Sequence, residues 1–345
     1  MPLFGFLKRY NILSKIEKAA QYGLINVYYP RFITPKVLYS FYSLWYYIGI
    51  IPTVKKLVNR KKYDYIIAFW AFPDGVAAVK IGQRFGLPVF VKVLGCDINQ
   101  LPKRKDLRKQ IRKSLSIANG IIAVSHPLKE NVVALGITED NILVAENGID
   151  DTVFHLRETS AISKKLGYPE KQKTILYIGR FSEEKNPMLL LEAVHLLKEG
   201  GCRFRVVICG WGEMQHQMLQ YTKDNELEDI VYFLGELKHH QVAEHMSCAD
   251  VLCLSSRREG YPNVLIEAIS CGLPVVATRV GGVPTIVVEG RNGLTVEPEN
   301  PEDMANKLKQ ALSHEWNRQV VKETLQVPTW KEVAEKTMEW IQQRI

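Results

Sequence analysis

The amino-acid sequence predicts an α/β fold with two tandem Rossmann-like, doubly wound domains and a cleft between them. Short apolar runs rich in β-forming residues alternate with helical stretches in two series, the first beginning at Asp64 and the second at Thr174. Such alternation is typical of βαβ units around a parallel sheet. The chain is also 345 residues long, which is more than a single hydrophobic core usually holds. Ligands of such folds bind beyond the carboxyl ends of the strands, so the cleft is the expected site.

The first series follows an aromatic and basic segment, residues 1–60. Helical patterning covers residues 12–20 and 38–58, and the apolar run 37–51 predicts either a core helix or an interfacial helix. This run is shorter than the ~18 residues that a helix needs to span a bilayer. The strands predicted for the first series are 65–69, 89–94, 121–124 and 142–145.

A strongly amphipathic helix is predicted for residues 101–118. One face carries Leu107, Ile111 and Leu115. The other faces carry seven cations, Lys103, Arg104, Lys105, Arg108, Lys109, Arg112 and Lys113. This basic 103–113 helix either lies on an anionic membrane or meets an acidic acceptor, or it is an ordinary solvated flank.

The polar, lysine-rich stretch 157–173 is interpreted as the interdomain linker. The strands predicted after it are 174–178, 204–209, 230–234, 250–254, 274–277 and 293–296. A last helix is predicted for residues 330–345. The predicted organisation is therefore an N-terminal domain of residues 1–165, a C-terminal domain of residues 170–327 and a C-terminal helix within 328–345.

The net charge and the cysteine content limit the kinds of binding partner and the cellular compartment that we expect for this protein. The net charge is +8 and the pI is about 9.0, which favours anionic partners such as phosphorylated ligands, acidic lipid or nucleic acid. No nucleic-acid-binding motif accompanies this charge, so no nucleic-acid partner is expected. The six cysteines form no C-x-x-C pair, which is typical of reduced thiols in a cytosolic protein. The N-terminus does not show the order of regions found in a signal peptide.

Two carboxylates, Glu259 and Glu267, bracket a Gly-Tyr-Pro-Asn turn beyond the 250–254 strand. Pro262 suits the first turn of a helix, so the next three amides would be unpaired donors that favour an anionic group. Glu267 lies one turn further on and can accept hydrogen bonds from a vicinal diol with both oxygens. The alternative is an acidic first turn favoured by the helix dipole, beside an unrelated loop glutamate.

Two cations follow the first strand of the second series. Arg180 comes directly after Gly179 at the strand's end, and Lys185 lies five residues later. The planar fork of arginine and the point charge of lysine suit a diphosphate whose negative charge grows as it leaves. The alternative is a pair of surface charges that bind Glu183 and Glu184.

Further loops at the same sheet edge allow a close approach of the backbone to a ligand. The Gly210-x-Gly212 turn lacks the third glycine of a dinucleotide fingerprint, so it predicts only a tight turn toward a base or phosphate. Leu234 and the glycine after it follow the next strand and offer the same approach. The loop 281–284, Gly-Gly-Val-Pro, is a flexible loop at this edge.

With these motifs in place, the chain resembles the family 4 glycosyltransferases of the GT-B fold, which are retaining and sugar-nucleotide dependent. The resemblance covers residues 64–345 and is strongest in the second domain. Its motifs are the 179–186 loop, the Gly210-x-Gly212 turn, the EX7E pair of Glu259 and Glu267, and the 281–284 loop. In the first domain, residues 95–99, 125–129 and 147–150 also look like family landmarks.

The resemblance implies a retaining, hexosyltransferase-type enzyme that moves a sugar from a nucleoside diphosphate sugar to an acceptor hydroxyl, without a metal or cofactor. Arg180 and Lys185 would stabilise the leaving diphosphate, and Glu259 would position the donor sugar. Glu267 would hold the ribose. The other implied donor-binding residues are Gly179, Gly210, Gly212, Leu234, Gly260, Asn263, Val264 and Leu265. Those implied on the acceptor or sugar side are Gly95, Asp97 and Ser125.

The chain departs from the family pattern in its first domain. Members usually open with a strand and a glycine-rich loop, whereas this chain opens with helical patterning, so a domain shortened at its N-terminus is expected. Many members also carry a histidine directly before the Gly-x-Asp motif, where this chain has Leu94. In this family the final helix crosses back to the first domain, and we expect the same of residues 330–345.

The implied process is cell-surface polysaccharide or glycolipid synthesis in the cytoplasm, at the inner face of the membrane if the basic helix binds lipid. The expected partners are the donor, a saccharide or lipid-linked acceptor and an anionic membrane surface. Two alternatives stay open: a catalytically defective or truncated nucleotide-sugar-binding relative, and a GT-B sugar-nucleotide epimerase.

Overall fold

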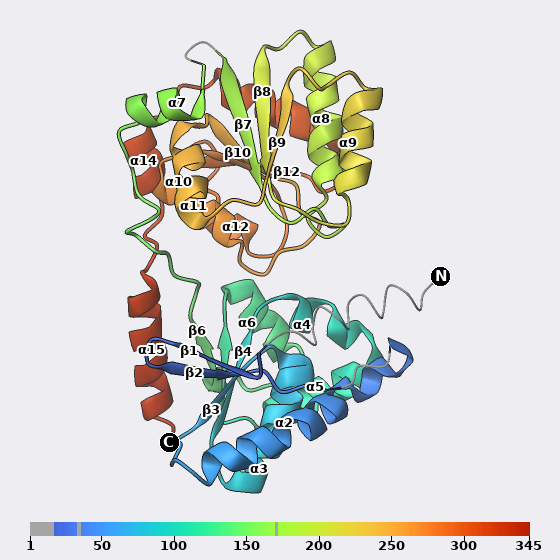
Figure 1. Cartoon of the computed structure of the whole chain (residues 1–345), viewed down its shortest axis with the longest axis vertical. Coiled ribbons are helices and arrows are strands. Elements are labelled where there is room, and N and C mark those ends of the chain that lie inside the picture. Colours follow the sequence, from blue (N-terminus) through green and yellow to red (C-terminus); the bar gives the residue numbers. More distant parts are fainter. Residues whose placement is uncertain (1–16, 33–35, 170–171) are drawn as a thin grey trace.

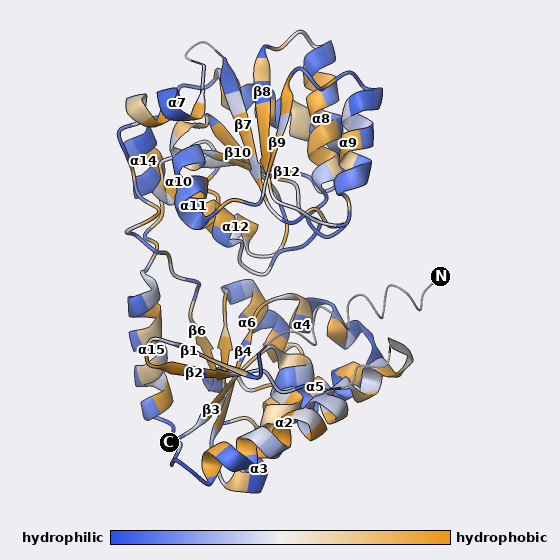
Figure 2. Ribbon diagram, in the orientation of Figure 1, coloured by the Kyte–Doolittle hydropathy of each residue, from blue (hydrophilic) through white to orange (hydrophobic). Residues whose placement is uncertain are grey.

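The computed structural model describes residues 17–32, 36–169 and 172–345. Figure 1 shows two α/β domains, one above the other, each with a parallel sheet covered by helices. The hydropathy colours of Figure 2 place the apolar residues on the strands and on the helix faces beside them. Within these ranges, no helix combines the length and the hydrophobicity needed to cross a membrane.

The first domain contains a four-stranded parallel sheet of order β3-β4-β5-β6. Its strands are β3 (Ile66–Phe69), β4 (Val89–Val93), β5 (Gly120–Ala123) and β6 (Ile142–Val144). Its helices are η1 (Lys36–Phe41), α2 (Tyr42–Val58), η2 (Ala71–Gly75), α3 (Val76–Phe85), α4 (Cys96–Asn99), η3 (Leu101–Lys103), α5 (Lys105–Ile117), α6 (His126–Val133) and η4 (Glu139–Asn141). The four strands predicted for the first series are confirmed to within one residue at each end.

The second domain contains a six-stranded parallel sheet of order β12-β11-β10-β7-β8-β9. Its strands are β7 (Lys173–Ile178), β8 (Phe204–Cys209), β9 (Val231–Gly235), β10 (Val251–Leu254), β11 (Val275–Thr278) and β12 (Gly293–Val296). Its helices are α7 (Ser160–Leu166), α8 (Pro187–Glu199), α9 (Gln215–Asp224), α10 (His239–Cys248), α11 (Asn263–Ser270), α12 (Val283–Ile286), α13 (Pro301–Ser313) and α14 (Arg318–Glu323). Strands β10, β11 and β12 are buried at every position, as expected of a sheet covered on both faces. The six predicted strands are confirmed to within one residue.

Helix α5 has the amphipathic arrangement that its sequence predicts. Leu107, Ile111 and Leu115 are completely buried against the first domain. The seven cations of residues 103–113 are all exposed. The apolar stripe therefore positions the helix, while the cationic faces remain in contact with solvent.

The segment before α2 differs from the prediction. Residues 17–20 lie at the end of the predicted helix 12–20, yet they lead into strand β1 (Ala19–Tyr22), which pairs with β2 (Ile25–Tyr28) in an antiparallel hairpin. The remainder of that prediction, residues 12–16, lies outside the described residues. The reason for the difference is the turn at Gly23, whose φ of 58° is readily adopted only by glycine. The predicted helix 38–58 is confirmed from residue 42 onward, after the 3-10 helix η1.

The stretch interpreted as a linker is partly helical. Helix α7 occupies residues 160–166 and ends at Gly167, whose left-handed φ of 66° is typical of a helix C-terminus. The lysine-rich composition suggested a linker. Composition alone, however, does not distinguish a solvated helix from an extended segment.

The last helix, α15 (Trp330–Gln342), lies beside the sheet of the first domain in Figure 1. Trp340 packs on Phe90 of β4 with ring centroids 5.8 Å apart. Val333 and Ile341 are buried in the same cluster, against Ile122. The chain enters this helix through a parallel bridge between Ile149 and Thr329.

Candidate active site

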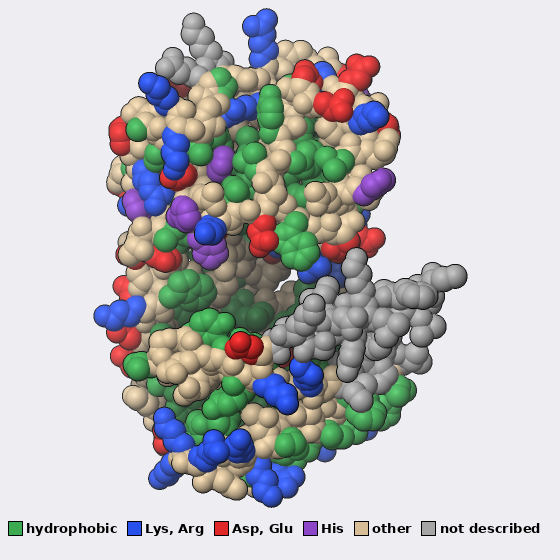
Figure 3. All heavy atoms as spheres, viewed as in Figure 1, with side chains coloured by type: hydrophobic (Ala, Val, Ile, Leu, Met, Phe, Trp, Pro, Cys, Tyr) green, Lys and Arg blue, Asp and Glu red, His purple; other side chains and the backbone are tan. Residues whose placement is uncertain are grey.

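Loops from both domains meet at the hollow between them that Figure 3 shows. A cavity of about 220 Å³ lies between loops of the two domains. It is lined by Cys96, Asn99 and Gln100 of the first domain and by Arg257, Arg258, Glu259, Val280 and Gly281 of the second. The cavity therefore contains one member of the carboxylate pair that the sequence identified.

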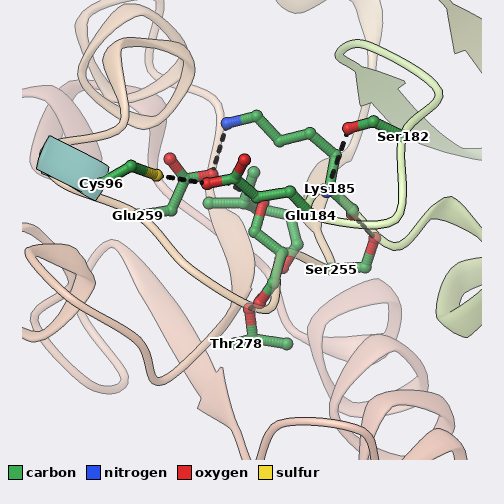
Figure 4. Close-up of polar contacts among 9 residues, drawn as sticks. Cys96, Ser182, Glu184, Lys185, Ser255, Glu259 and Thr278 are labelled. Atoms are coloured by element: carbon green, nitrogen blue, oxygen red, sulfur yellow. Dashed lines mark hydrogen bonds and ion pairs between the residues drawn. The ribbon is translucent and has the colours of Figure 1, made fainter. Parts of the chain in front are cut away.

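Glu259 is a deeply buried carboxylate in the wall of this cavity. Its side chain is only 7% exposed, and Lys185 Nζ donates to its Oε1 at 2.7 Å (Figure 4). Ser256 Oγ donates to the same oxygen at 2.6 Å. A buried carboxylate needs such partners because its desolvation is costly. The structure thus unites two predicted residues that are 74 positions apart in the sequence.

Hydrogen bonds from side-chain hydroxyls to backbone carbonyls hold the loops that carry this ion pair. Ser255 Oγ donates to the carbonyl oxygen of Lys185 at 3.1 Å, joining the loop after β10 to the loop after β7. Thr278 Oγ1, at the end of β11, donates to the carbonyl oxygen of Ser256 at 2.5 Å. Three neighbouring strand ends thereby fix the position of Glu259, as the parallel sheet requires.

The predicted glycine turns pack against the loop after β7. Gly210 has a φ of 142°, and a Cβ at this position would collide with the carbonyl oxygen of Gly179. A Cβ on Gly212 would collide with the backbone of Phe181. The glycines allow the loop after β8 to lie directly on the loop after β7, so this structure explains them by packing.

Arg180 lies apart from the Lys185–Glu259 ion pair. Its Nη2 atom is 3.4 Å from Glu213 Oε2, and its guanidinium lies 5.7 Å from the centre of the Trp211 ring. The side chain is 63% exposed. Neither Arg180 nor Lys185 pairs with Glu183 or Glu184, which was the alternative drawn from the sequence.

Glu267 projects from the second turn of α11. Its carboxylate makes no hydrogen bond or ion pair with any residue in the described ranges, so both oxygens remain available as acceptors. Burial raises the pKa of Glu267 above its ordinary value of 4.5, and the charge of His239 opposes this rise. Pro262 is the N-cap of α11 rather than its first helical residue, so the helix begins at Asn263.

The donor-binding prediction placed three amides at this helix N-terminus and one further residue after β9. The three amides are those of Asn263, Val264 and Leu265, the first residues of α11. The amide of Leu265 donates to the carbonyl oxygen of Pro262 at 3.1 Å, so it is already engaged in the helix. Leu234 lies near the end of β9 and is 42% exposed.

The three residues predicted on the acceptor or sugar side have different environments. Asp97 is completely buried, and its carboxylate accepts from the amides of Ala71, Leu94 and Gly95 at 2.8–3.1 Å. Burial raises the pKa of Asp97, while these amides lower it. Asp97 therefore holds the loop after β4 in place and has no free oxygen for a substrate. Ser125 caps α6 and lies 3.5 Å from the carbonyl oxygen of Gly260.

Gly95 and Gly260 bring the two domains into direct backbone contact. A Cβ on Gly260 would collide with the carbonyl oxygen of Leu94, and one on Gly95 would crowd the Cα of Gly260. Gly281 touches the carbonyl oxygen of Glu259 in the same way. The glycines at this point let the loop of Glu259 in the second domain lie against the loop after β4 of the first domain.

Two interdomain contacts involve Cys96, Glu184 and Asn147, which the sequence did not single out as site residues. Cys96 Sγ donates to Glu184 Oε1 at 2.8 Å across the cleft (Figure 4). Asn147 Nδ2 donates to Asn263 Oδ1 at 2.8 Å. Cys96, Asn147 and Glu184 lie in the loops after strands β4, β6 and β7, and this location could have marked them as candidate site residues. Among the described residues, no three His, Cys, Asp or Glu side chains gather as a metal site would require.

Two family models match consecutive parts of the chain. The model described as "Glycosyltransferase Family 4" matches residues 16–153, and the one described as "Glycosyl transferases group 1" matches residues 158–326. The two models thus meet between the two domains and together span both of them.

Curated relatives and solved structures agree with these models. The N-acetyl-alpha-D-glucosaminyl L-malate synthase of Bacillus anthracis is 28% identical over 298 residues, which cover 84% of this chain and 77% of that protein. The putative teichuronic acid biosynthesis glycosyltransferase TuaC of Bacillus subtilis (strain 168) is 30% identical over 259 residues, covering 74% of this chain and 63% of TuaC. Anabaena HepE in complex with UDP superimposes with a TM-score of 0.74 at 21% identity, over 86% of this chain and 84% of HepE. The chain belongs to the family 4 glycosyltransferases, and its two domains have the GT-B fold of that family.

Proposed function

We propose that this glycosyltransferase moves a hexose from a nucleoside diphosphate sugar to an acceptor hydroxyl with retention at the anomeric carbon and without a metal ion. The observation that carries the proposal is the buried Lys185–Glu259 ion pair at the carboxyl ends of the second sheet, facing the first domain. A cation and a carboxylate fixed side by side can act on the two halves of the donor, its diphosphate and its sugar.

The donor would lie along the carboxyl edge of the second sheet. Lys185 and Arg180 would stabilise the diphosphate, with the free amides at the start of α11 contributing the helix dipole. The carboxylate of Glu267 has no hydrogen-bond partner among the described residues and would accept from the ribose hydroxyls. HepE structures with UDP and with UDP-glucose support a nucleotide-sugar donor, because they have the same fold.

The chemical step breaks the bond between the anomeric carbon and a diphosphate oxygen. The acceptor oxygen forms its new bond on the same face, and its proton passes to the leaving diphosphate. Glu259 would hydrogen-bond the sugar and hold it in position, and Lys185 would neutralise charge that develops on the diphosphate. Closing the two domains around the donor would exclude water that could otherwise hydrolyse it.

The acceptor would belong to cell-surface polysaccharide or glycolipid synthesis. The names of the B. anthracis and B. subtilis relatives refer to L-malate and to teichuronic acid, both acidic. The exposed cations of α5 would hold the enzyme on the anionic inner face of the cytoplasmic membrane, close to a lipid-linked acceptor.

The test begins with a thermal-shift screen of UDP, GDP, ADP, dTDP and their hexose derivatives. A ligand at 100 times its Kd should stabilise the protein by roughly 2.7 kcal/mol. With the best donor, we expect Glu259→Gln to lower the transfer rate by on the order of 100-fold while the variant still folds. The matched control is Glu302→Gln, which removes an exposed carboxylate from α13.

Proton NMR of the product should show the donor's anomeric configuration, and excess EDTA should leave the rate unchanged. Inversion would contradict retention, and an EDTA-sensitive rate would contradict a metal-independent reaction. Full activity of Glu259→Gln would contradict the proposed role of Glu259. If no nucleoside diphosphate stabilises the protein, the proposed donor class is wrong.

A further inference from the structure

The charged residues that line the interdomain cavity are not all neutralised. Arg257 is engaged, because its Nε donates to Glu299 Oε1 at 2.7 Å and its Nη1 donates to the carbonyl oxygen of Glu183 at 3.2 Å. Glu259 is neutralised by Lys185. The third charged residue in the wall is Arg258, and its guanidinium makes no hydrogen bond, ion pair or ring contact within the described part of the chain.

Arg258 acts electrostatically on the opposite wall of the cavity. Burial raises the pKa of the Cys96 thiol to about 12, and Glu184 adds to this rise, whereas Arg258 opposes it. Cys96 belongs to the first domain and lines the same cavity. The positive charge of Arg258 is therefore felt across the cleft.

Two residues with amide side chains, Asn99 and Gln100, line the cavity from the first domain. Asn99 Oδ1 accepts from Asn131 Nδ2 at 3.0 Å, which leaves the Asn99 Nδ2 group free to donate. The side chain of Gln100 forms no hydrogen bond in the described structure. One uncompensated guanidinium and two free amides thus border a single cavity. Among the described residues that line it, the one carboxylate is that of Glu259, which already has a lysine partner.

We propose that Arg258, Asn99 and Gln100 form a subsite for a carboxylate carried by one of the two substrates, either the acceptor or the transferred sugar. Arginine suits this ligand because its planar fork donates two parallel hydrogen bonds to a carboxylate. The inference rests on the proposed function, which assigns the diphosphate its own cations, Arg180 and Lys185, and so leaves Arg258 for a different charge.

The size of the cavity limits what it can hold. Its volume of about 220 Å³ is below the ~300–1,000 Å³ of pockets that enclose a whole drug-sized ligand. It therefore takes one part of a substrate, such as a uronic acid ring or a small dicarboxylic acid. An exposed arginine without a partner is common on a protein surface. Arg258, however, directly precedes Glu259 and lines the same cavity, so it lies where the substrates are proposed to bind.

The experiment has two arms that separate the two sources of the carboxylate. In the donor arm, calorimetry compares UDP-glucuronate with UDP-glucose, which differ at C6 of the sugar. In the acceptor arm, saturation-transfer NMR compares D-glucuronate and L-malate with D-glucose, both on the free protein and in the presence of UDP. We expect the acid to bind at least about 10-fold more tightly than its neutral counterpart in one arm.

Variants then test whether Arg258 is the cause. Arg258→Ala should abolish the preference for the acid, and Arg258→Lys should keep part of it, because lysine retains the charge but not the fork. Arg291→Ala is the control, since Arg291 is an exposed arginine just before β12, at the amino ends of the strands. UDP alone should bind all of these variants alike.

A preference in the donor arm assigns the carboxylate to the transferred sugar, and one in the acceptor arm assigns it to the acceptor. Absence of any preference, or a preference that Arg258→Ala retains, overturns the inference. The proposed function would fail differently, through the absence of nucleoside diphosphate binding in the thermal-shift screen.

Discussion

At the scale of single residues, the site is a set of charges whose burial decides their roles. Glu259 is almost inaccessible and tied to Lys185 and Ser256, so its position is strongly constrained. Arg180 is mostly exposed and held only by an ion pair and a ring contact with the loop after β8. Exposed pairs of this kind contribute little to stability, so Arg180 can leave Glu213 for a diphosphate at low energetic cost.

The burial of the Glu267 carboxylate costs free energy of folding, and the same carboxylate is proposed to bind the donor. Burial raises its pKa, so its contribution to stability is fully present below about pH 4.5 and is lost as the pH rises through the raised value. Glu267→Gln cannot ionise, and we therefore expect it to raise Tm at pH 7 and to lose this advantage below pH 4.5. The same variant should weaken UDP binding at pH 7, because we propose that the ionised carboxylate accepts hydrogen bonds from the ribose hydroxyls.

Thermal melts with and without UDP from pH 4 to pH 7.5 would measure both effects. Glu315→Gln, which changes an exposed carboxylate of the same charge, should alter neither. Tighter or unchanged UDP binding by Glu267→Gln would remove this residue from the donor site.

At the scale of elements, α5 shows how one pattern serves packing and surface charge together. Its buried leucine and isoleucine stripe matches the helical period, so its position follows from the hydrophobic effect. Lys105, Lys109 and Lys113 repeat every four residues and form one exposed row. Such a row can approach a flat anionic surface as a unit.

Replacing these three lysines by glutamine should weaken binding to vesicles that contain anionic phospholipid. Each cation near such a surface contributes roughly 1 kcal/mol, so the triple variant should bind on the order of 100-fold more weakly. Sedimentation with vesicles of phosphatidylglycerol and phosphatidylcholine measures this. The control removes three scattered exposed lysines, Lys309, Lys322 and Lys336, and should change binding much less. Equal binding of the lysine-row variant and the natural protein would show that the row is only solvated.

At the scale of the whole molecule, the two domains approach through glycines. Gly260 lies between Glu259 and the loop after β4, so the ion pair and the first domain are linked by direct backbone contact. The Cys96–Glu184 and Asn147–Asn263 hydrogen bonds lie across the same boundary. The completeness of the site therefore depends on how closely the domains can approach.

Gly260→Ala should hold the domains apart, because the added Cβ would collide with the carbonyl oxygen of Leu94. We expect a larger radius of gyration in small-angle X-ray scattering and a transfer rate lowered by about 100-fold, as a displacement near 1 Å can cause. Gly200→Ala is the control, since Gly200 has a φ of −71° and room for a methyl group. A Gly260→Ala protein with unchanged scattering and rate would show that the domains adapt to the methyl group.

Sequence alone determined the order of most strands and helices in both domains, and it predicted Lys185 and Glu259, which the structure brings together. It could do so because buried strands and amphipathic helices are encoded in short-range patterns, and because the ends of parallel strands share one edge. It failed for the hairpin at residues 19–28 and for α7, where local composition did not distinguish between structures. Only the tertiary structure decided that Lys185 rather than Arg180 pairs with Glu259, that Asp97 is a buried clamp, and that Gly95 meets Gly260. The physical reason is that Lys185 and Glu259, Ala71 and Asp97, and Gly95 and Gly260 lie on different loops, 26 or more positions apart in the sequence. Their pairing therefore depends on how the sheets and domains are placed and on no pattern within either loop.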